Sequence, residues 1–274
     1  WTIDDDNTVS IPYGKIPWRF RYLPEDHDDG EKPFLGQRGR FNGEDVIDIV
    51  ARQPATAQFI AKKLYNFFVS DEPDLAAENI LADAYLQYQC DIRSVLRVLF
   101  SSDFFKAEKV RFAKVKSPAE VVVGTLHLLG DFKFPKWGIF EVALECRYLG
   151  QDLLNPPTVE GWHTGKEWID SGSLVGRVNF VANQVGNINQ PGIRAMADAL
   201  LDRGLVLSPE EVLDGCLELM GQLQLRPGTR QQLLDQIRRS SQVLTDCEEG
   251  RQAAQEIILR TLKMIGSTRE YQFA

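Results

Sequence analysis

The feature that most constrains this chain is a series of amphipathic segments that begins after residue 41. The segment starting at Pro54 carries apolar residues at spacings of three and four: Ala57, Ile60, Ala61, Leu64, Phe67 and Phe68. The segment after Asp91 repeats this pattern: Ile92, Val95, Leu96, Leu99 and Phe100. Such spacing places apolar side chains along one stripe of an α-helix, and the stripe must pack against another element. The sequence therefore predicts a mainly α protein, with many helices in an orthogonal or bundle-like array.

Capping residues mark where several of these helices begin. "SPAE" at 117–120 and "SPEE" at 208–211 match the capping box, in which the serine accepts an N–H bond and the glutamate reaches back. Asn42 and Asp91 are expected to cap two further helices, and Pro73 to start another. Helices are also expected over 137–149, 173–188, 192–203, 210–221, 229–243 and 250–266.

Residues 1–41 lack the helical period. Residues 18–23 alternate as a short strand would, and Gly36 and Gly39 offer turn positions. We expect 1–41 to form an irregular segment or small β-hairpin packed on a main helical body, 42–189. The "NQPG" at 189–192 favours a hinge there, followed by a C-terminal helical subdomain, 190–274.

Composition argues against two classes of partner. The 274 residues carry a net charge of −8, and their lysines and arginines are scattered rather than clustered. That charge repels a phosphate backbone, so nucleic acid is not expected as a partner. No segment approaches the roughly 18 uninterrupted apolar residues of a membrane span, so no span is expected in this chain.

The four cysteines, Cys90, Cys146, Cys216 and Cys247, are widely separated. They form none of the close pairs typical of zinc sites or redox motifs. Buried free thiols are favoured over a disulfide.

The stretch "PEDHDDGEKPFLG" (24–36) gathers carboxylates around a histidine. The stretch from Asp26 does not match a calcium-binding EF-hand loop. That loop needs an acid or amide at its fifth position, glycine at its sixth and glutamate at its twelfth, where this sequence has Gly30, Glu31 and Gln37. A looser metal site anchored by His27 would need ligands from elsewhere in the chain. The favoured interpretation is an exposed turn in which His27 or Asp28 bonds the backbone of the following hairpin, while Lys32 offsets the acids.

The stretch "NPPTVEGWHTGKEW" (155–168) describes a shaped loop rather than a linker. Its glycines and Lys166 resemble a phosphate-binding loop, but the spacing is one residue short and the metal-binding hydroxyl is replaced by glutamate. Trp162 and Trp168 offer a stacking platform for a sugar or a peptide, with His163 as a polar partner. Tryptophans in such loops more often fill the core beneath them, and that interpretation is favoured.

Motifs of common enzyme classes are missing from the sequence. There is no G-x-S-x-G, no H-E-x-x-H and no G-x-G-x-x-G. This weakens an enzymatic interpretation without excluding it, because catalytic triads assemble from distant positions.

Several stretches, in this order, resemble the bacterial "domain of unknown function 1800" family: "WTID", "HDDGEKPFLG", "FNGEDVIDIVARQPATAQFIAKKLYNFFVSDEP", "DIRSVLRVLFSSDFF", "VKSPAEVVVGTLHLLG", "LGQDLLNPPTVEGW" and "EYQFA". The resemblance implies a mostly helical protein, usually longer at its N-terminus and often exported, with no established activity. This chain is accordingly expected to be the C-terminal part of a member, in the periplasm, at the cell surface or secreted.

The family pattern falls on two groups of positions, which become the candidate functional residues. They are His27, Asp28, Gly30, Lys32, Leu35 and Gly36 in the first loop, and Pro156, Gly161, Trp162 and Trp168 in the second.

Two functions are weighed. The first is a non-catalytic binding or assembly module that uses His27, Asp28, Lys32, Gly161, Trp162 and Trp168, with another exported protein or a surface glycan as partner and no cofactor. The alternative is a hydrolase of an extracellular polymer or ester, with His27 as base and Asp28 as orienting group, or with a metal held there. Convergence of His27 and the 155–168 loop on one cleft would favour the enzyme.

Overall fold

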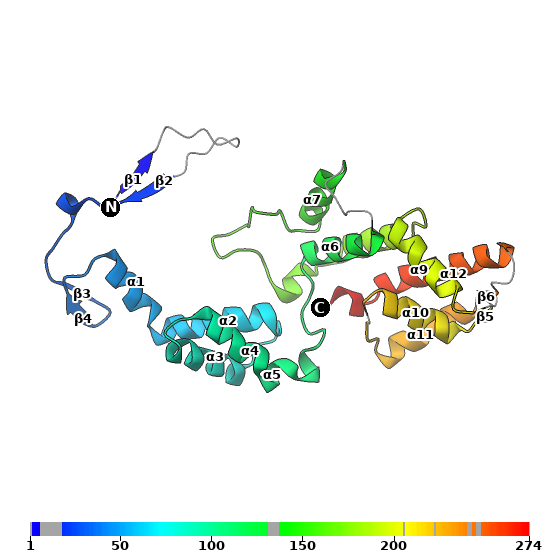
Figure 1. Cartoon of the computed structure of the whole chain (residues 1–274), viewed down its shortest axis with the longest axis horizontal. Coiled ribbons are helices and arrows are strands. Elements are labelled where there is room, and N and C mark those ends of the chain that lie inside the picture. The colour runs from blue at the N-terminus through cyan, green and yellow to red at the C-terminus, as the bar shows by residue number, and fades with distance from the viewer. Residues whose placement is uncertain are drawn as a thin grey trace. The chain divides into compact units, whose positions relative to one another are not determined.

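The structure is a computed structural model, and it describes residues 2–5, 18–130, 137–204, 206–221, 223–239, 243–244 and 248–273. Helices dominate this part of the chain, which confirms the mainly α prediction (Figure 1). The chain divides into two compact units: unit 1 is Trp1–Lys62 with Ala76–Val98, and unit 2 is Lys63–Leu75 with Leu99–Ala274. The expected division into 1–41, 42–189 and 190–274 stays a prediction.

Unit 1 begins with two small antiparallel sheets. Strand β1 (Thr2–Asp5) pairs with β2 (Trp18–Arg21), and after the 3₁₀ turn η1 (Pro24–Asp26), β3 (Lys32–Phe34) pairs with β4 (Gln37–Gly39). The turn between β3 and β4 consists of Leu35 and Gly36, at φ 45° and 80°. Positive φ at both central residues is typical of the type I′ turn, whose twist matches that of a tight hairpin.

The helices of unit 1 are α1 (Gly43–Ala51), the first part of α2 (Pro54–Phe68), α3 (Leu75–Gln87) and most of α4 (Ile92–Ser101). Asn42 caps α1 as predicted, in a capping box with Asp45. Asp91 accepts the N–H of Ser94 at 3.0 Å at the start of α4. The buried apolar side chains of this unit are Ile49, Ala57, Ala61, Ala77, Leu81, Ala82, Ala84, Tyr85 and Val95.

The predicted apolar stripe of α2 is wrong at Phe67. The residues that α2 buries most deeply are Ala57, Ala61 and Tyr65, at a spacing of four. Phe67 lies two residues beyond Tyr65, on the far side of the helix, and is 69% exposed. Its ring rests edge-on against Phe68, with centroids 4.7 Å apart, so a local aromatic pair takes the place of core packing.

Unit 2 holds the remaining helices: α5 (Asp103–Lys106), η2 (Glu108–Val110), α6 (Pro118–Leu129), α7 (Ile139–Tyr148), η3 (Gly165–Trp168), α8 (Ser171–Val185), α9 (Pro191–Leu201), α10 (Pro209–Leu219), α11 (Pro227–Arg238), α12 (Glu248–Gly266) and η4 (Glu270–Gln272). Both predicted capping boxes are present. Ser117 and Glu120 form one at α6, and Ser208 and Glu211 form the other at α10.

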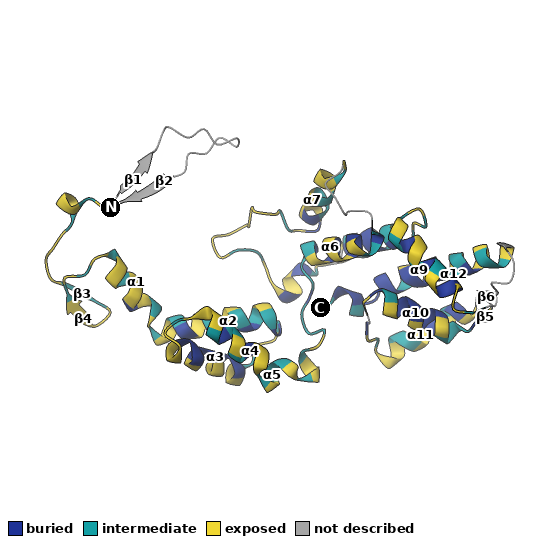
Figure 2. Ribbon diagram, viewed as in Figure 1, coloured by how far each residue is buried: buried dark blue, intermediate teal, exposed yellow. Residues whose placement is uncertain are grey.

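Helix α12 is central to the core of unit 2, because it contacts α8, α9, α10 and α11. Its residues Ile258, Leu262 and Ile265 are completely buried, and Figure 2 shows the buried stretches of α6, α10 and α12 in dark blue. One continuous cluster joins these helices, from Val121 in α6 to Tyr271 in η4. The core therefore contains residues from both sides of position 189.

Two strands in unit 2 were not predicted. Strand β5 (Val206–Leu207) pairs antiparallel with β6 (Val243–Leu244). The helix expected over 229–243 is wrong at its end, since α11 stops at Arg238 and Val243 pairs with Leu207. Leu207 is buried in the main core, so pairing with it outweighs the local helical pattern.

The thiols follow the expectation where they are described. Cys146 and Cys216 are buried free thiols, and Cys90 is a half-buried free thiol. Cys247 lies outside the described residues.

Candidate functional site

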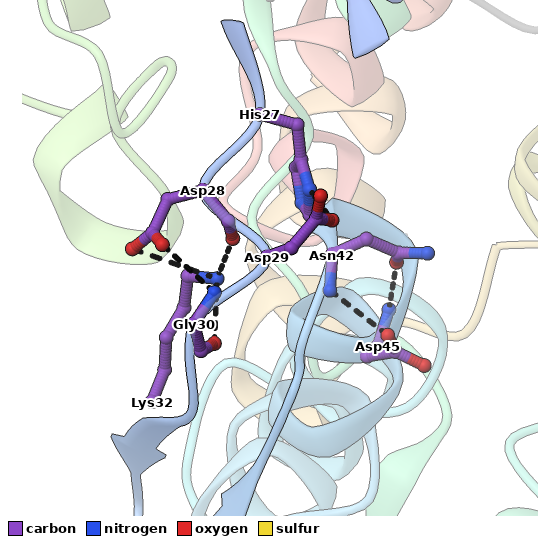
Figure 3. A network of polar contacts seen from close by, with 7 residues as sticks. All are labelled: His27, Asp28, Asp29, Gly30, Lys32, Asn42 and Asp45. Atoms are coloured by element: carbon purple, nitrogen blue, oxygen red, sulfur yellow. Dashed lines mark hydrogen bonds and ion pairs between the residues drawn. The ribbon is translucent and has the colours of Figure 1, made fainter. Parts of the chain in front are cut away.

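The acidic turn of unit 1 is held by bonds within itself (Figure 3). The Asp28 Oδ1 atom accepts the Gly30 N–H at 2.8 Å, and the Lys32 ammonium donates to the carbonyl oxygens of Asp28 and Gly30. The His27 Nδ1 atom lies 2.8 Å from Asp29 Oδ1. Asp28 thus bonds the backbone of Gly30, two residues before the β3–β4 hairpin, rather than the backbone of the hairpin itself.

The two acids beside His27 play different parts. The Gly30 N–H bond and the charge of Lys32 hold the pKa of the Asp28 carboxyl below its ordinary 3.8, so it stays ionised. The carboxylate that contacts the His27 ring is that of Asp29, which is 85% exposed, whereas the His27 side chain is only 13% exposed. Tyr22 covers the ring, with centroids 5.7 Å apart. The group that orients His27 is therefore Asp29.

The second loop, 155–168, is shaped by short-range backbone bonds. Thr158 and Gly161 form an antiparallel bridge, and the Gly161 N–H donates to the Thr158 carbonyl at 3.1 Å. The loop ends in the 3₁₀ turn η3, where His163 Nδ1 lies 3.0 Å from Glu167 Oε2.

The two tryptophans of this loop differ in environment. Trp168 is 7% exposed, with the His163 ring edge-on to it at 6.3 Å, and it fills the core beneath the loop. Trp162 is half-buried, and its indole Nε1 has no hydrogen-bond partner among the described residues. An N–H group that is shielded from solvent and makes no hydrogen bond destabilises a fold. Of the two tryptophans, Trp162 is therefore the one whose missing hydrogen bond a ligand could supply.

The same loop closes one side of a cavity of about 510 Å³ in unit 2. Its walls come from residues 65–74, 109–115, 164–166 and 269–273. Apolar lining is provided by Val110, Phe112 and Phe273, among others. The charged lining residues are Asp71, Glu72, Asp74, Lys109, Lys166 and Arg269.

Gly165 lets the loop approach this cavity closely. Its φ is +60°, and a Cβ atom there would lie 3.2 Å from both Cβ and Cγ of Asp71. A side chain at this position would meet both backbone strain and a tight contact. The glycine is therefore required by geometry, and it sets Lys166 beside the acids of residues 71–74.

Most charges around the cavity are paired. The Asp71 carboxylate accepts the Val115 N–H at 2.7 Å and lies 3.5 Å from Lys114 Nζ. Lys166 Nζ lies 2.8 Å from Glu72 Oε1. Their hydrogen bond lowers the pKa of Glu72 and raises that of Lys166.

Residues near the end of the chain form another wall of the cavity. Val115 and Phe273 make an antiparallel bridge, and the Lys116 N–H donates to the Gln272 carbonyl at 2.9 Å. The Arg269 guanidinium carbon lies 5.0 Å from the centroid of the Phe273 ring. Phe273, in the closing "EYQFA" segment, thereby forms part of the cavity wall.

Sequence features point to only one wall of this cavity. Gly165 and Lys166 resemble part of a phosphate-binding loop, whereas Asp71 and Arg269 belong to no recognisable motif. The available signal was the acidic turn "SDEPD" at 70–74, which places three carboxylates between two helices. Nothing local connects it with residues 164–166 or 269–273.

The two predicted loops belong to different units. His27, Asp28 and Lys32 are in unit 1, whereas Gly161, Trp162 and Trp168 are in unit 2. Their convergence on one cleft therefore stays a prediction.

Two further features were sought in the described part of the chain. No group of three or more His, Cys, Asp or Glu side chains there is arranged to hold a metal ion. None of the helices described combines the length and apolar character needed to cross a membrane.

Comparison with known families assigns the chain. A family model described as "Protein of unknown function (DUF1800)" matches residues 1–273. The chain belongs to the DUF1800 family. This confirms the resemblance seen in the sequence, and the DUF1800 match includes both loops and all four cavity walls. No curated protein and no solved structure matches the chain.

Proposed function

We propose that this DUF1800 protein is a non-catalytic binding or assembly module of an exported bacterial system. The observation that carries the proposal is the cavity of unit 2, whose walls come from four separate stretches of sequence and include the shaped loop 155–168. Concave sites with mixed apolar and charged lining are typical of ligand recognition. Its volume of about 510 Å³ suits a small molecule or a short peptide.

Trp162 supplies a second argument for binding. It lies in the loop that bounds the cavity, half-buried, and its indole N–H has no partner among the described residues. A ligand with a carbonyl or hydroxyl oxygen would accept this bond while stacking on the ring. Both a surface glycan and a peptide from another exported protein carry such groups.

The test is calorimetric titration of the protein with soluble oligosaccharides and with peptides, accompanied by assays for hydrolysis of each. Trp162→Ala is expected to weaken binding by about tenfold or more, as for other buried tryptophan anchors. Trp137→Ala is the matched control, because Trp137 is 99% exposed and lies outside the loop. Undiminished binding by the folded Trp162→Ala variant, or turnover of any bound compound, would contradict the proposal.

The alternative, a hydrolase of an extracellular polymer or ester, is favoured by one contact. The Asp29 carboxylate at 2.8 Å from His27 Nδ1 leaves the Nε2 atom for proton transfer, as in a base and its orienting group. Hydrolysis of an activated ester that is lost in His27→Ala and reduced in Asp29→Asn, but retained in Asp26→Asn, would support this function. Elemental analysis of the purified, folded chain tests the metal-assisted version.

We also propose that the protein acts in the periplasm, at the cell surface or outside the cell, with another exported protein or a surface glycan as partner. The support is the family resemblance noted in the sequence. Fractionation of the native host, with detection of the full-length protein, tests this location. Recovery in the cytosol alone would overturn it.

A further inference from the structure

We propose that the cavity of unit 2 binds a monovalent organic carboxylate on an apolar group, with the Arg269 guanidinium as counter-ion. The inference rests on the proposed binding function and names the class of ligand. The carboxylate belongs either to a small organic acid or to the C-terminus of a peptide.

Arg269 stands apart from the other charged residues of the cavity. Glu72 is paired with Lys166, at 2.8 Å, and Asp74 with Lys109, at 3.2 Å. Among the described residues, Arg269 has no carboxylate oxygen within 4.0 Å, and its side chain makes no hydrogen bond. Its contact with the Phe273 ring, at 5.0 Å from Cζ to the centroid, leaves the N–H donors available.

The fork of N–H donors on a guanidinium matches the two oxygens of a carboxylate or a phosphate. The neighbouring charges decide between them. Asp71, Glu72 and Asp74 line the same cavity, and a phosphate with nearly two charges would be repelled by all three. A single carboxylate charge is better matched to the single charge of Arg269.

Apolar residues of the cavity can contact the apolar group of the ligand. Val110, Phe112 and Phe273 line the cavity beside the charged groups. Phe112 also packs against the core of unit 2, and its backbone has φ +53°, a strained conformation for a residue with a side chain. Such strain is often found where a side chain is held in place for a ligand. An apolar group beside the carboxylate would bury itself against this ring.

The cavity also provides charges that can rearrange. The Lys166 and Glu72 side chains are 85% and 73% exposed, and ion pairs so exposed are weak. Lys166 is close enough to Arg269 for the two positive charges to interact. A bound carboxylate would relieve this repulsion, so Lys166 is expected to strengthen binding as a secondary group.

The experiment uses calorimetric titration of the whole chain with defined probes. N-acetyl-phenylalanine and N-acetyl-phenylalanine amide differ only in the carboxylate, while hexanoate and an N-acetylated tripeptide ending in phenylalanine distinguish a free acid from a peptide terminus. We expect carboxylate probes to bind about tenfold more tightly than the amide. Arg269→Ala should remove this preference, and Arg269→Lys should retain part of it.

Arg260→Ala is the matched control, since Arg260 is an exposed arginine in α12 that does not line the cavity. It should bind the probes as the wild type does. Equal binding of acid and amide, unchanged binding by Arg269→Ala, or no carboxylate-dependent binding by any probe would overturn the assignment. A glycan or peptide that binds through Trp162 and is indifferent to Arg269 would overturn it while leaving the proposed function in place.

Discussion

Replacement of Gly192 by alanine tests the packing of α9 on α6. Gly192 is the second residue of α9, directly after Pro191, where the helix meets the end of α6. A Cβ atom at Gly192 would lie 2.0 Å from the Leu128 carbonyl oxygen and 2.6 Å from the Leu129 carbonyl carbon. These are backbone atoms of α6, so no side-chain rotation can relieve the overlap.

The size of the effect follows from these distances. A comfortable carbon–oxygen contact is about 3.3 Å, so α9 must move by more than about 1 Å. The helix carries Ile193, Ala197 and Leu200, all of them almost completely buried, and they would move with it. Overpacking of this kind typically destabilises by 1–3 kcal/mol or more, and we expect a loss of about 3 kcal/mol for Gly192→Ala. The melting temperature should fall by roughly 6–12 °C.

Gly228 provides a matched control. It is also the second residue of a helix, after Pro227 in α11, but a Cβ there would meet nothing within 4 Å. Because alanine has the higher helix propensity, Gly228→Ala should be neutral or stabilise by up to about 1 kcal/mol. Circular dichroism at 222 nm during thermal and urea unfolding measures both variants. Equal melting temperatures for the two variants would refute the close approach of α9 and α6.

Two further predictions concern ionisation. The Asp170 carboxylate accepts the Ser173 N–H at 2.7 Å, and this bond holds the pKa of Asp170 below 3.8. The bond therefore stabilises the fold fully above pH 3.8, and this stabilisation is lost as the pH falls through the lower pKa of the folded state. Asp170→Asn should therefore flatten the acid limb of stability against pH in urea titrations, and an unchanged limb would contradict the capping role. Burial raises the pKa of Cys216 to about 12, so iodoacetamide at pH 8 should label Cys216 far more slowly than Cys90 in the folded protein, as peptide mapping would show. Equal labelling rates would contradict the burial.

The helices could be predicted because their signals are local. A capping box spans only four residues, so the boxes at Ser117 and Ser208 could be recognised without knowledge of the fold. The stripe of α4 is correct at Val95 and Leu99, which are completely buried, but its ends are exposed, Ile92 at 38% and Phe100 at 42%. The apolar stripe of a helix does not reveal which other helix it packs against.

The errors lie where tertiary contacts overrule local pattern. Val243 continues an apolar helical period, but it pairs with Leu207, some thirty-six residues earlier in the chain. Phe67 is apolar and correctly spaced from Leu64. It nevertheless lies on the exposed side of α2, away from the side on which Tyr65 is buried. For Val243 the deciding partner is distant in sequence, whereas the Phe67 ring contacts its neighbour Phe68 and stays exposed.

The candidate site shows the same limit more sharply. The close approach of Gly165 to Asp71 joins positions 94 apart, and Lys166 meets Glu72 across the same separation. Neither segment has a motif by itself. A glycine and a lysine in one loop and three acids in another become a site only after the core of unit 2 brings them together.

A buried arginine of α8 bonds the backbone next to this cavity. Arg177 is completely buried, and its Nη1 atom donates to the Lys116 carbonyl at 2.7 Å, next to the pairing of Lys116 with Gln272. Burial lowers the pKa of Arg177 to about 10, so at neutral pH the guanidinium still carries its charge inside the protein. A buried charge of this kind is costly for stability, and apolar packing alone would be the more stable choice. What it provides is a directed bond that holds one cavity wall in place, so that a ligand does not have to order that wall on binding.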